Sequence, residues 1–195
     1  MCIRDRAGAT CLGVLPNITT DPGTPDTNPT HTYLDPSTGK VETDLAFDEK
    51  VLAYLGNRCN YYEFGNEPDL NGISESEYAH KWDEFVPILK RINPNAKFFG
   101  PVTANFQGEA PCTYPAGQAK QCYMNAFLRD VANRKVIPSP EGITFHSYSN
   151  AGCGDGATPG PNCLINAPRT LTAGIKQVRA WMTKYLGKQL PLGIT

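Results

Sequence analysis

The 195-residue sequence has no long hydrophobic run and no surplus of basic charge. None of its apolar segments is long enough to span a bilayer as a helix. The formal net charge is −1 and no basic stripe is present, which argues against nucleic acid or an anionic membrane as partner. Hydrophobic residues make up 40% and aromatic residues 10%, which suits one medium-sized globular domain with its own core.

Several catalytic signatures are also missing from the sequence. It has only three histidines and no HExxH pattern, so nothing supports a zinc hydrolase. A GxSxG elbow, a phosphate-binding loop and a GxGxxG fingerprint are all absent. These absences remove the commonest serine hydrolase and nucleotide-binding classes.

Seven cysteines are present, and most of them form pairs that enclose loops rich in glycine or proline. Their spacings match neither a CxxC zinc site nor a redox motif. Cysteines that bracket loops are typical of oxidising compartments, so we expect disulfides and secretion. The alternative is that the cysteines are free thiols of a cytosolic protein. The candidate pairs are Cys112 with Cys122, Cys153 with Cys163 and, if their strands are neighbours, Cys11 with Cys59, which leaves Cys2 over.

The first residues, MCIRDR, contain no apolar segment of the kind found in a signal peptide. We therefore expect residues 1–6 to be a non-native leader or junction, and residues 7–195 to form one catalytic domain. A signal peptide would have been lost with a missing N-terminus.

Short apolar or aromatic runs alternate with amphipathic patterns along the chain. The runs are continuously apolar, as in parallel strands that are covered on both faces. The expected strands are 9–18, 60–66, 97–103, 142–148 and 190–194, and the expected helices are about 44–55, 75–93, 119–133 and 169–186. The helical stripes indicate core-facing surface.

This alternation predicts an α/β fold with right-handed parallel crossovers. The long inserts all follow strands, where α/β proteins carry their functional residues. They are residues 19–42, 67–73, 104–118 and 149–168.

The stretch YYEFGNEPD at residues 61–69 is an aromatic strand that ends in a turn. Pro68 cannot donate to a strand ladder, so Glu67 should lie at the carboxyl end of that strand. Glycosidic hydrolysis needs two carboxyl groups, about 5–5.5 Å apart for retention of configuration or 6.5–9.5 Å for inversion. Glu63 lies four residues away, about 13 Å along a strand, and is expected to be an interior hydrogen-bonded residue. Asp69 is too local to face Glu67 from the opposite side.

Other expected strand ends supply further polar residues. His146 and Tyr148 are two residues apart and therefore share one face of their strand. A lone buried histidine is as often a core residue as a functional one, but its position at a strand exit beside a tyrosine favours the site. Asn17, Thr103 and Asn105 lie at the ends of two other strands.

With these residues in view, the chain resembles the retaining glycoside hydrolases of clan A, which share the (β/α)8 barrel. Asn66-Glu67-Pro68 matches the clan's Asn-Glu-Pro at the end of the fourth strand, and GNEPD resembles the β-xylosidase-like and β-glucuronidase-like branches. His146-Ser147-Tyr148 fits the His-x-Tyr of the sixth strand. The resemblance covers nearly the whole chain and implies an α/β fold, a partial TIM barrel with about strands 3–7 of eight.

The resemblance also implies roles for individual residues. Glu67 would be the general acid/base, and Asn66 would bind the sugar's 2-hydroxyl. His146 would line the sugar site nearest the cleaved bond, Tyr148 would orient the nucleophile, and Asn17 and Asn105 are further substrate-binding candidates. The seventh strand ends in the clan's nucleophilic glutamate, which is expected just after Thr195. The substrate class is carbohydrate, and no metal or organic cofactor is required.

A barrel reduced to five strands would have two unpaired edges and no closed interior. We therefore expect the 195-residue chain alone to fold poorly and to hydrolyse no glycoside. The sugar, the linkage and the choice between endo and exo action depend on loops that the sequence does not specify.

Two other functions fit parts of the sequence. The chain could be a non-catalytic carbohydrate-binding or scaffold protein that uses the same aromatic-lined face. It could also be a different (β/α)8 hydrolase or lyase whose acid pair includes Asp155. Glycan affinity that survives Glu67→Gln would favour the first, and activity that survives Glu67→Ala would favour the second.

Overall fold

A computed structural model describes residues 10–15, 18, 43–104, 122–147 and 161–195. Its centre is a five-stranded parallel sheet in the order β1-β2-β3-β4-β5, so each strand lies beside the next one along the chain. This sequential order and the parallel direction confirm the α/β topology expected from the sequence. The strands are β1 (Leu12–Leu15), β2 (Tyr61–Phe64), β3 (Lys97–Thr103), β4 (Gly142–Phe145) and β5 (Leu192–Ile194).

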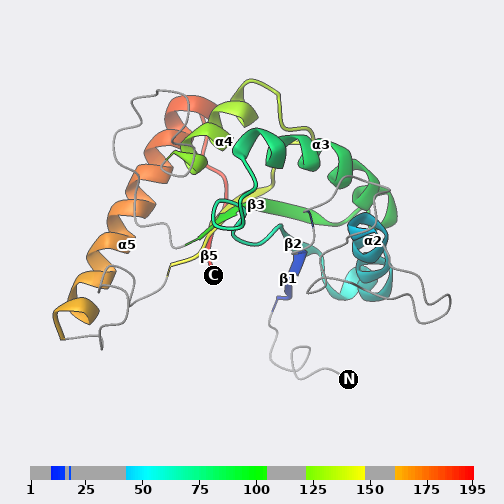
Figure 1. Cartoon of the computed structure of the whole chain (residues 1–195), viewed down its shortest axis with the longest axis horizontal. Coiled ribbons are helices and arrows are strands. Elements are labelled where there is room, and N and C mark those ends of the chain that lie inside the picture. Colours follow the sequence, from blue (N-terminus) through cyan, green and yellow to red (C-terminus); the bar gives the residue numbers. More distant parts are fainter. Residues whose placement is uncertain (1–9, 16–17, 19–42, 105–121, 148–160) are drawn as a thin grey trace.

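Four long helices connect these strands and form an arc around the outside of the sheet (Figure 1). A 3-10 turn, η1 (Gly56–Arg58), follows the first of them, and a π-helical segment, η3 (Met182–Leu186), ends the last. The helices are α2 (Asp44–Leu55), α3 (Glu75–Ile92), α4 (Tyr123–Ala132) and α5 (Pro161–Trp181).

The helix ends follow from local sequence. Thr43 caps α2 by accepting a hydrogen bond from the amide of Ala46 at 3.1 Å, and Gly56 ends it with a φ of 48°. Ser74 caps α3 by accepting from the amide of Glu77 at 3.3 Å, as the spacing of these two residues predicts. Each side-chain cap satisfies a backbone amide in the first turn of its helix.

The core lies between the helices and the outer face of the sheet. Phe64 on β2 contacts three rings of α3, with centroid distances of 5.4–5.8 Å. The apolar stripe predicted for α4 is fully buried, and the stripe of α3 is buried except for Ile92, which is 42% exposed. Burying one large side chain contributes roughly 1.5–3 kcal/mol, so this aromatic layer is a main source of stability. The α3 residues that contact Phe64 are Tyr78, Trp82 and Phe85.

Some expected boundaries were wrong. Helix α5 begins at Pro161 rather than near 169, because Pro168 is tolerated inside it, and the insert expected over 149–168 is therefore shorter. Strand β1 begins at Leu12 and is described to Leu15, whereas 9–18 was expected, and residues 9, 16 and 17 lie outside the described residues. Strand β2 ends at Phe64, because Gly65 with a φ of 83° turns the chain, and β4 and β5 are also shorter than predicted.

The expectation that every strand is covered on both faces was wrong for β1. Leu12 and Val14 are 41% and 45% exposed, whereas Leu15 is buried beneath the helices. Because alternate residues of a strand point to opposite faces, Leu12 and Val14 share the face that no described helix covers. We call this second face, which carries Val14, Glu63, Phe99 and Thr144 by register, the inner face.

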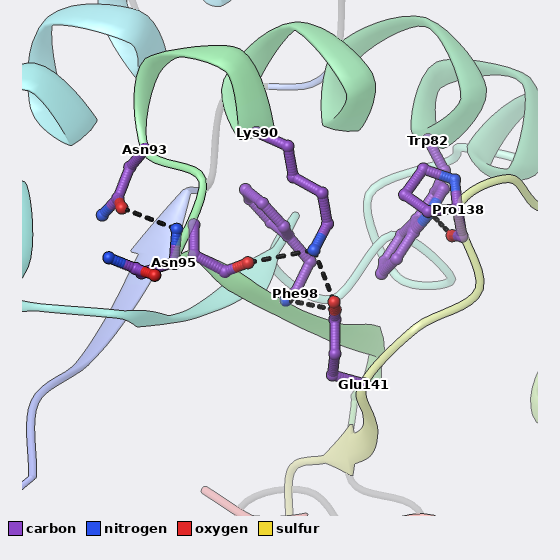
Figure 2. Close-up of polar contacts among 8 residues, drawn as sticks. Trp82, Lys90, Asn93, Asn95, Phe98, Pro138 and Glu141 are labelled. Atoms are coloured by element: carbon purple, nitrogen blue, oxygen red, sulfur yellow. Dashed lines mark hydrogen bonds and ion pairs between the residues drawn. The ribbon is translucent and has the colours of Figure 1, made fainter.

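A polar cluster joins α3 to the amino ends of β3 and β4 (Figure 2). The Glu141 carboxylate accepts hydrogen bonds from the Lys90 ammonium and, at 2.8 Å, from the amide of Phe98. Lys90 also donates to the carbonyl of Ala96 at 3.0 Å. Beside it, Asn93 accepts from the amide of Asn95 at 3.1 Å. This cluster lies at the end of the sheet opposite Glu67, where side chains serve stability in barrel-like folds.

Replacing Glu141 with alanine should destabilise the protein by about 1–3 kcal/mol, because the Phe98 amide loses its acceptor and the partly exposed Lys90 ammonium loses one of its two partners. Urea unfolding of the product of the complete reading frame that contains residues 1–195 (below, the full-frame protein) measures this loss. Glu49→Ala, on α2, is the control for removing one glutamate. A loss below about 0.5 kcal/mol, the size expected of a surface substitution, would contradict the prediction.

Two disulfides involve described cysteines. Cys11 and Cys59 are bonded, which ties the start of β1 to the residues before β2. This is the pairing that the sequence allowed if the two strands are neighbours, and they are. Cys122 is also disulfide-bonded. Its expected partner Cys112 lies outside the described residues. Cys153 does too, and Cys163 falls within α5.

Glu75, in the first turn of α3, is a carboxyl group with an unusual environment. One of its oxygens is buried without a hydrogen bond. The pKa of Glu75 is raised from 4.5 to about 7, mainly by burial and less by the nearby charge of Asp130, while Lys135 and Arg129 act in the opposite direction. Protonated Glu75 is therefore favoured in the folded state.

This raised pKa predicts a pH dependence of stability. Between about pH 4.5 and 7 the folded state binds more protons than the unfolded state, so stability should fall as pH rises through this range. Glu75→Gln should flatten that decline, and Glu77→Gln in the same turn should not. Urea unfolding at several pH values tests both variants, and identical slopes in the two would contradict the assignment.

None of the described helices is both long and apolar enough to cross a membrane.

Candidate active site

Glu67 lies in the turn that follows β2, at the carboxyl end of the sheet. Gly65, with a φ of 83°, directs the chain out of the strand, and an added Cβ there would lie 2.7 Å from the Ile18 side chain. The Glu67 amide donates to the carbonyl of Val102 on β3 at 3.0 Å, and its carbonyl accepts from the amide of Asn71 at 2.9 Å. Backbone bonds on both sides therefore fix this glutamate.

Two residues in contact here have strained backbones. Glu67 has a φ of 47° and Val102 a φ of 54°, in the left-handed region that non-glycine residues rarely adopt. Val102 is β-branched, for which this conformation is particularly unfavourable, and the register of β3 against β4 shifts at this point. Strained residues cluster at functional sites, where the surrounding structure holds them in place.

His146 contacts the Glu67 side chain directly. Its Nδ1 lies 2.7 Å from Glu67 Oε1, and the two side chains are only 11% and 16% exposed. The His146 amide donates to the carbonyl of Thr103 at 2.9 Å, which holds the histidine at the end of β4. Since β3 lies between β2 and β4, this contact bridges two strands that are not neighbours.

Asp69 fastens the loop after β2 to the turn after β3. Its Oδ1 accepts a hydrogen bond from the amide of Ala104 at 2.9 Å. Burial raises the pKa of Asp69, hydrogen bonds from the amides of Ala104, Asp69 and Leu70 offset part of this, and the charge of Glu67 adds a smaller increase. Asp69 thus holds the loop that carries Glu67, and it does not face Glu67 across the site.

Glu63 is buried, with 1% of its surface exposed, and it accepts a hydrogen bond from the Thr195 hydroxyl at 3.0 Å. The expectation of an interior, hydrogen-bonded residue is therefore confirmed. Its partner, however, is 132 positions away in the sequence, at the end of β5. Sequence reasoning missed this contact because no local pattern connects the two residues.

The predicted site residues divide into two groups. Glu67 and His146 are brought together, and Asn66 lies beside Glu67 with its carbonyl accepting from the Asn71 side chain at 2.8 Å. Asn17, Asn105 and Tyr148 lie outside the described residues.

Within the described ranges, no group of three or more histidine, cysteine, aspartate or glutamate side chains could hold a metal ion.

No protein-family model and no curated protein matches the sequence. Solved structures do match the fold. A xyloglucanase of glycoside hydrolase family 44 from Paenibacillus polymyxa aligns with a TM-score of 0.64 and 14% identity over 98% of this chain and 51% of its own. A family 44 endoglucanase from Clostridium thermocellum aligns with a TM-score of 0.59 and 19% identity over 90% of this chain and 43% of its own. A β-xylosidase from Caulobacter crescentus aligns with a TM-score of 0.54 and 20% identity over 86% of this chain and 34% of its own.

These similarities show the fold. The chain has a glycoside-hydrolase-like α/β fold, and its five parallel strands correspond to part of a TIM-barrel-like sheet. It spans between about a third and a half of the length of these solved proteins.

Proposed function

We propose that these residues belong to the catalytic domain of a retaining glycoside hydrolase of clan A, with Glu67 as the general acid/base. The observation that carries the proposal is the contact between Glu67 and His146 at the carboxyl end of a glycoside-hydrolase-like sheet. The carboxyl ends of the strands are where enzymes of this architecture place their catalytic side chains.

The proposed reaction is a double displacement. Protonated Glu67 donates its proton to the leaving glycosidic oxygen while a second carboxylate attacks the anomeric carbon. Glu67, now a carboxylate, then removes a proton from the water that releases the sugar. Asn66 binds the 2-hydroxyl of the sugar at the cleaved bond, and His146 fixes the orientation of the Glu67 carboxyl group through its 2.7 Å contact.

The second carboxylate follows Thr195 in this proposal. Strand β5 pairs with β4, so its carboxyl end opens on the same edge of the sheet as Glu67 and His146. Retention requires about 5–5.5 Å between the two carboxyl groups. Glu63 is not the nucleophilic carboxylate in this proposal, because it is buried on β2 and hydrogen-bonded to Thr195.

The substrates are O-linked poly- or oligosaccharides, and the proposed chemistry uses no cofactor. The matched structures include a xyloglucanase, an endoglucanase and a β-xylosidase, which supports a carbohydrate substrate class. We further propose that the protein is secreted, because the Cys11–Cys59 disulfide persists in an oxidising compartment.

The test is an assay of the full-frame protein on aryl glycosides of glucose, xylose and glucuronic acid, followed by nuclear magnetic resonance of the first-formed anomer. Hydrolysis with retained configuration supports the proposal. Inverted configuration would overturn the mechanism. Glycan binding without hydrolysis, unaffected by Glu67→Gln, would instead identify a carbohydrate-binding or scaffold protein.

A further inference from the structure

The hydrogen bond between Thr195 and Glu63 connects strands that are far apart in the sheet. Strands β3 and β4 lie between β2 and β5, and adjacent strands are about 4.8 Å apart, so a flat sheet would separate them by about 14 Å. A glutamate and a threonine side chain cannot together reach that far. The 3.0 Å bond therefore shows that the inner face is concave at this level.

The register places both residues on the inner face. Glu63 aligns with Phe99, and Phe99 aligns with Gly142. Two residues further along β4, Thr144 aligns with Gly193, and Thr195 follows two residues later on β5. Gly193 packs closely against Thr144, because an added Cβ would lie 2.8 Å from the Thr144 methyl group.

Thr195 is held from two directions. Its amide donates to the carbonyl of Phe145 on β4 at 3.2 Å, and its hydroxyl donates to Glu63 on β2 at 3.0 Å. The backbone bond holds Thr195 against β4, and the side-chain bond restrains its rotamer towards β2. Two strands therefore restrict the orientation of Thr195.

We propose that Glu63 is a positioning residue that aims the residue after Thr195 at the reaction centre. The inference rests on the proposed function, in which that next residue is the nucleophilic carboxylate. Glu63 does not touch substrate. Glu63 lies on β2 and Glu67 in the turn that follows it, so one strand and its turn carry both the acid/base and the group that aligns its partner. Glu63 is buried at its end of this hydrogen bond, whereas Thr195 is exposed.

The experiment compares variants of the full-frame protein. Thr195→Val removes the donor and Glu63→Leu removes the acceptor while keeping similar side-chain volumes. Each should lower kcat about 10- to 100-fold with little change in KM, because small misplacements of a reacting group have effects of that size. The rate of inactivation by a 2-deoxy-2-fluoro glycoside, which reports attack by the nucleophile, should fall equally.

Conservative and control variants separate positioning from general damage. Glu63→Gln keeps an oxygen acceptor and Thr195→Ser keeps a hydroxyl donor, so both should retain kcat within about threefold, far above the loss expected when alignment fails. The double variant Glu63→Leu/Thr195→Val should be no slower than either single variant, because one bond is removed in each case. Thr144→Val is the matched control, since this buried inner-face hydroxyl has no hydrogen-bond partner.

The outcomes distinguish this inference from the proposed function. An active parent whose Glu63→Leu and Thr195→Val variants keep kcat would overturn the positioning role alone. So would additive losses in the double variant, or an equal loss from Thr144→Val. A parent that hydrolyses no glycoside would overturn the proposed function, and the positioning role with it.

Discussion

Replacing Glu67 with glutamine should lower kcat of the full-frame protein by about 10²–10⁴-fold, the usual contribution of a general acid/base. Glutamine has nearly the same shape and can still contact His146, so the fold should be unchanged. The loss should be largest for substrates with poor leaving groups, because these need protonation of the glycosidic oxygen in the first step. A dinitrophenyl glycoside, whose leaving group needs little help, should lose far less in that step.

The pH profile provides a second readout for Glu67→Gln. The parent should show a bell-shaped dependence of kcat/KM on pH, with the descending limb reporting loss of the acid's proton. The variant should lack that limb, because glutamine does not titrate. Glu77→Gln, in the first turn of α3, serves as the control for removing one carboxylate. Full activity in Glu67→Gln with every leaving group would instead point to an acid pair elsewhere, such as one that includes Asp155.

Breaking the Cys11–Cys59 disulfide should destabilise the full-frame protein by about 4 kcal/mol. The bond closes a loop with a sequence separation of 48, and the chain-entropy relation gives about this value for a loop of that size. Within the described residues, β1 is a four-residue strand that pairs with β2 alone. Loss of the bond should therefore release β1 first, with rapid amide exchange over Leu12–Leu15.

The two cysteines provide an internal control for this effect. Cys59 is buried and Cys11 is partly buried, so Cys59→Ser should cost more than Cys11→Ser if lost packing dominates. Similar losses in both single variants, measured by urea unfolding, indicate that the cross-link is the cause. A loss below about 1 kcal/mol in Cys11→Ser would contradict the prediction, since the range for removing a native disulfide begins near 2 kcal/mol.

The sequence alone determined the element types and their order. Aromatic and apolar runs separated by amphipathic patterns predicted the parallel α/β fold, and the expected helices 44–55 and 75–93 agree with α2 and α3 to within one residue. These predictions hold because strand and helix periodicity and capping depend on residues within a few positions of one another. The predicted start of α5 near residue 169 was wrong, because the helix accommodates Pro168 in its interior.

The sequence also singled out Glu67 and His146, through the turn after an aromatic strand and the His-x-Tyr spacing. It did not predict that the two side chains touch, because 79 positions separate them and the contact passes over β3. Nor did it predict the strained Val102, whose carbonyl holds the Glu67 amide. That strain is a property of how β3 shifts register against β4, which no local pattern encodes.

The partner of Glu63 was decided by tertiary structure alone. Local reasoning required only that a buried carboxylate find a hydrogen bond, because an unpaired one is costly. Which donor supplies it depends on the curvature of the sheet, and this brings Thr195 within 3.0 Å across two intervening strands. Residue chemistry thus determined what each side chain needs, whereas the curved sheet determined which side chains meet, because it sets distances between residues that are remote along the chain.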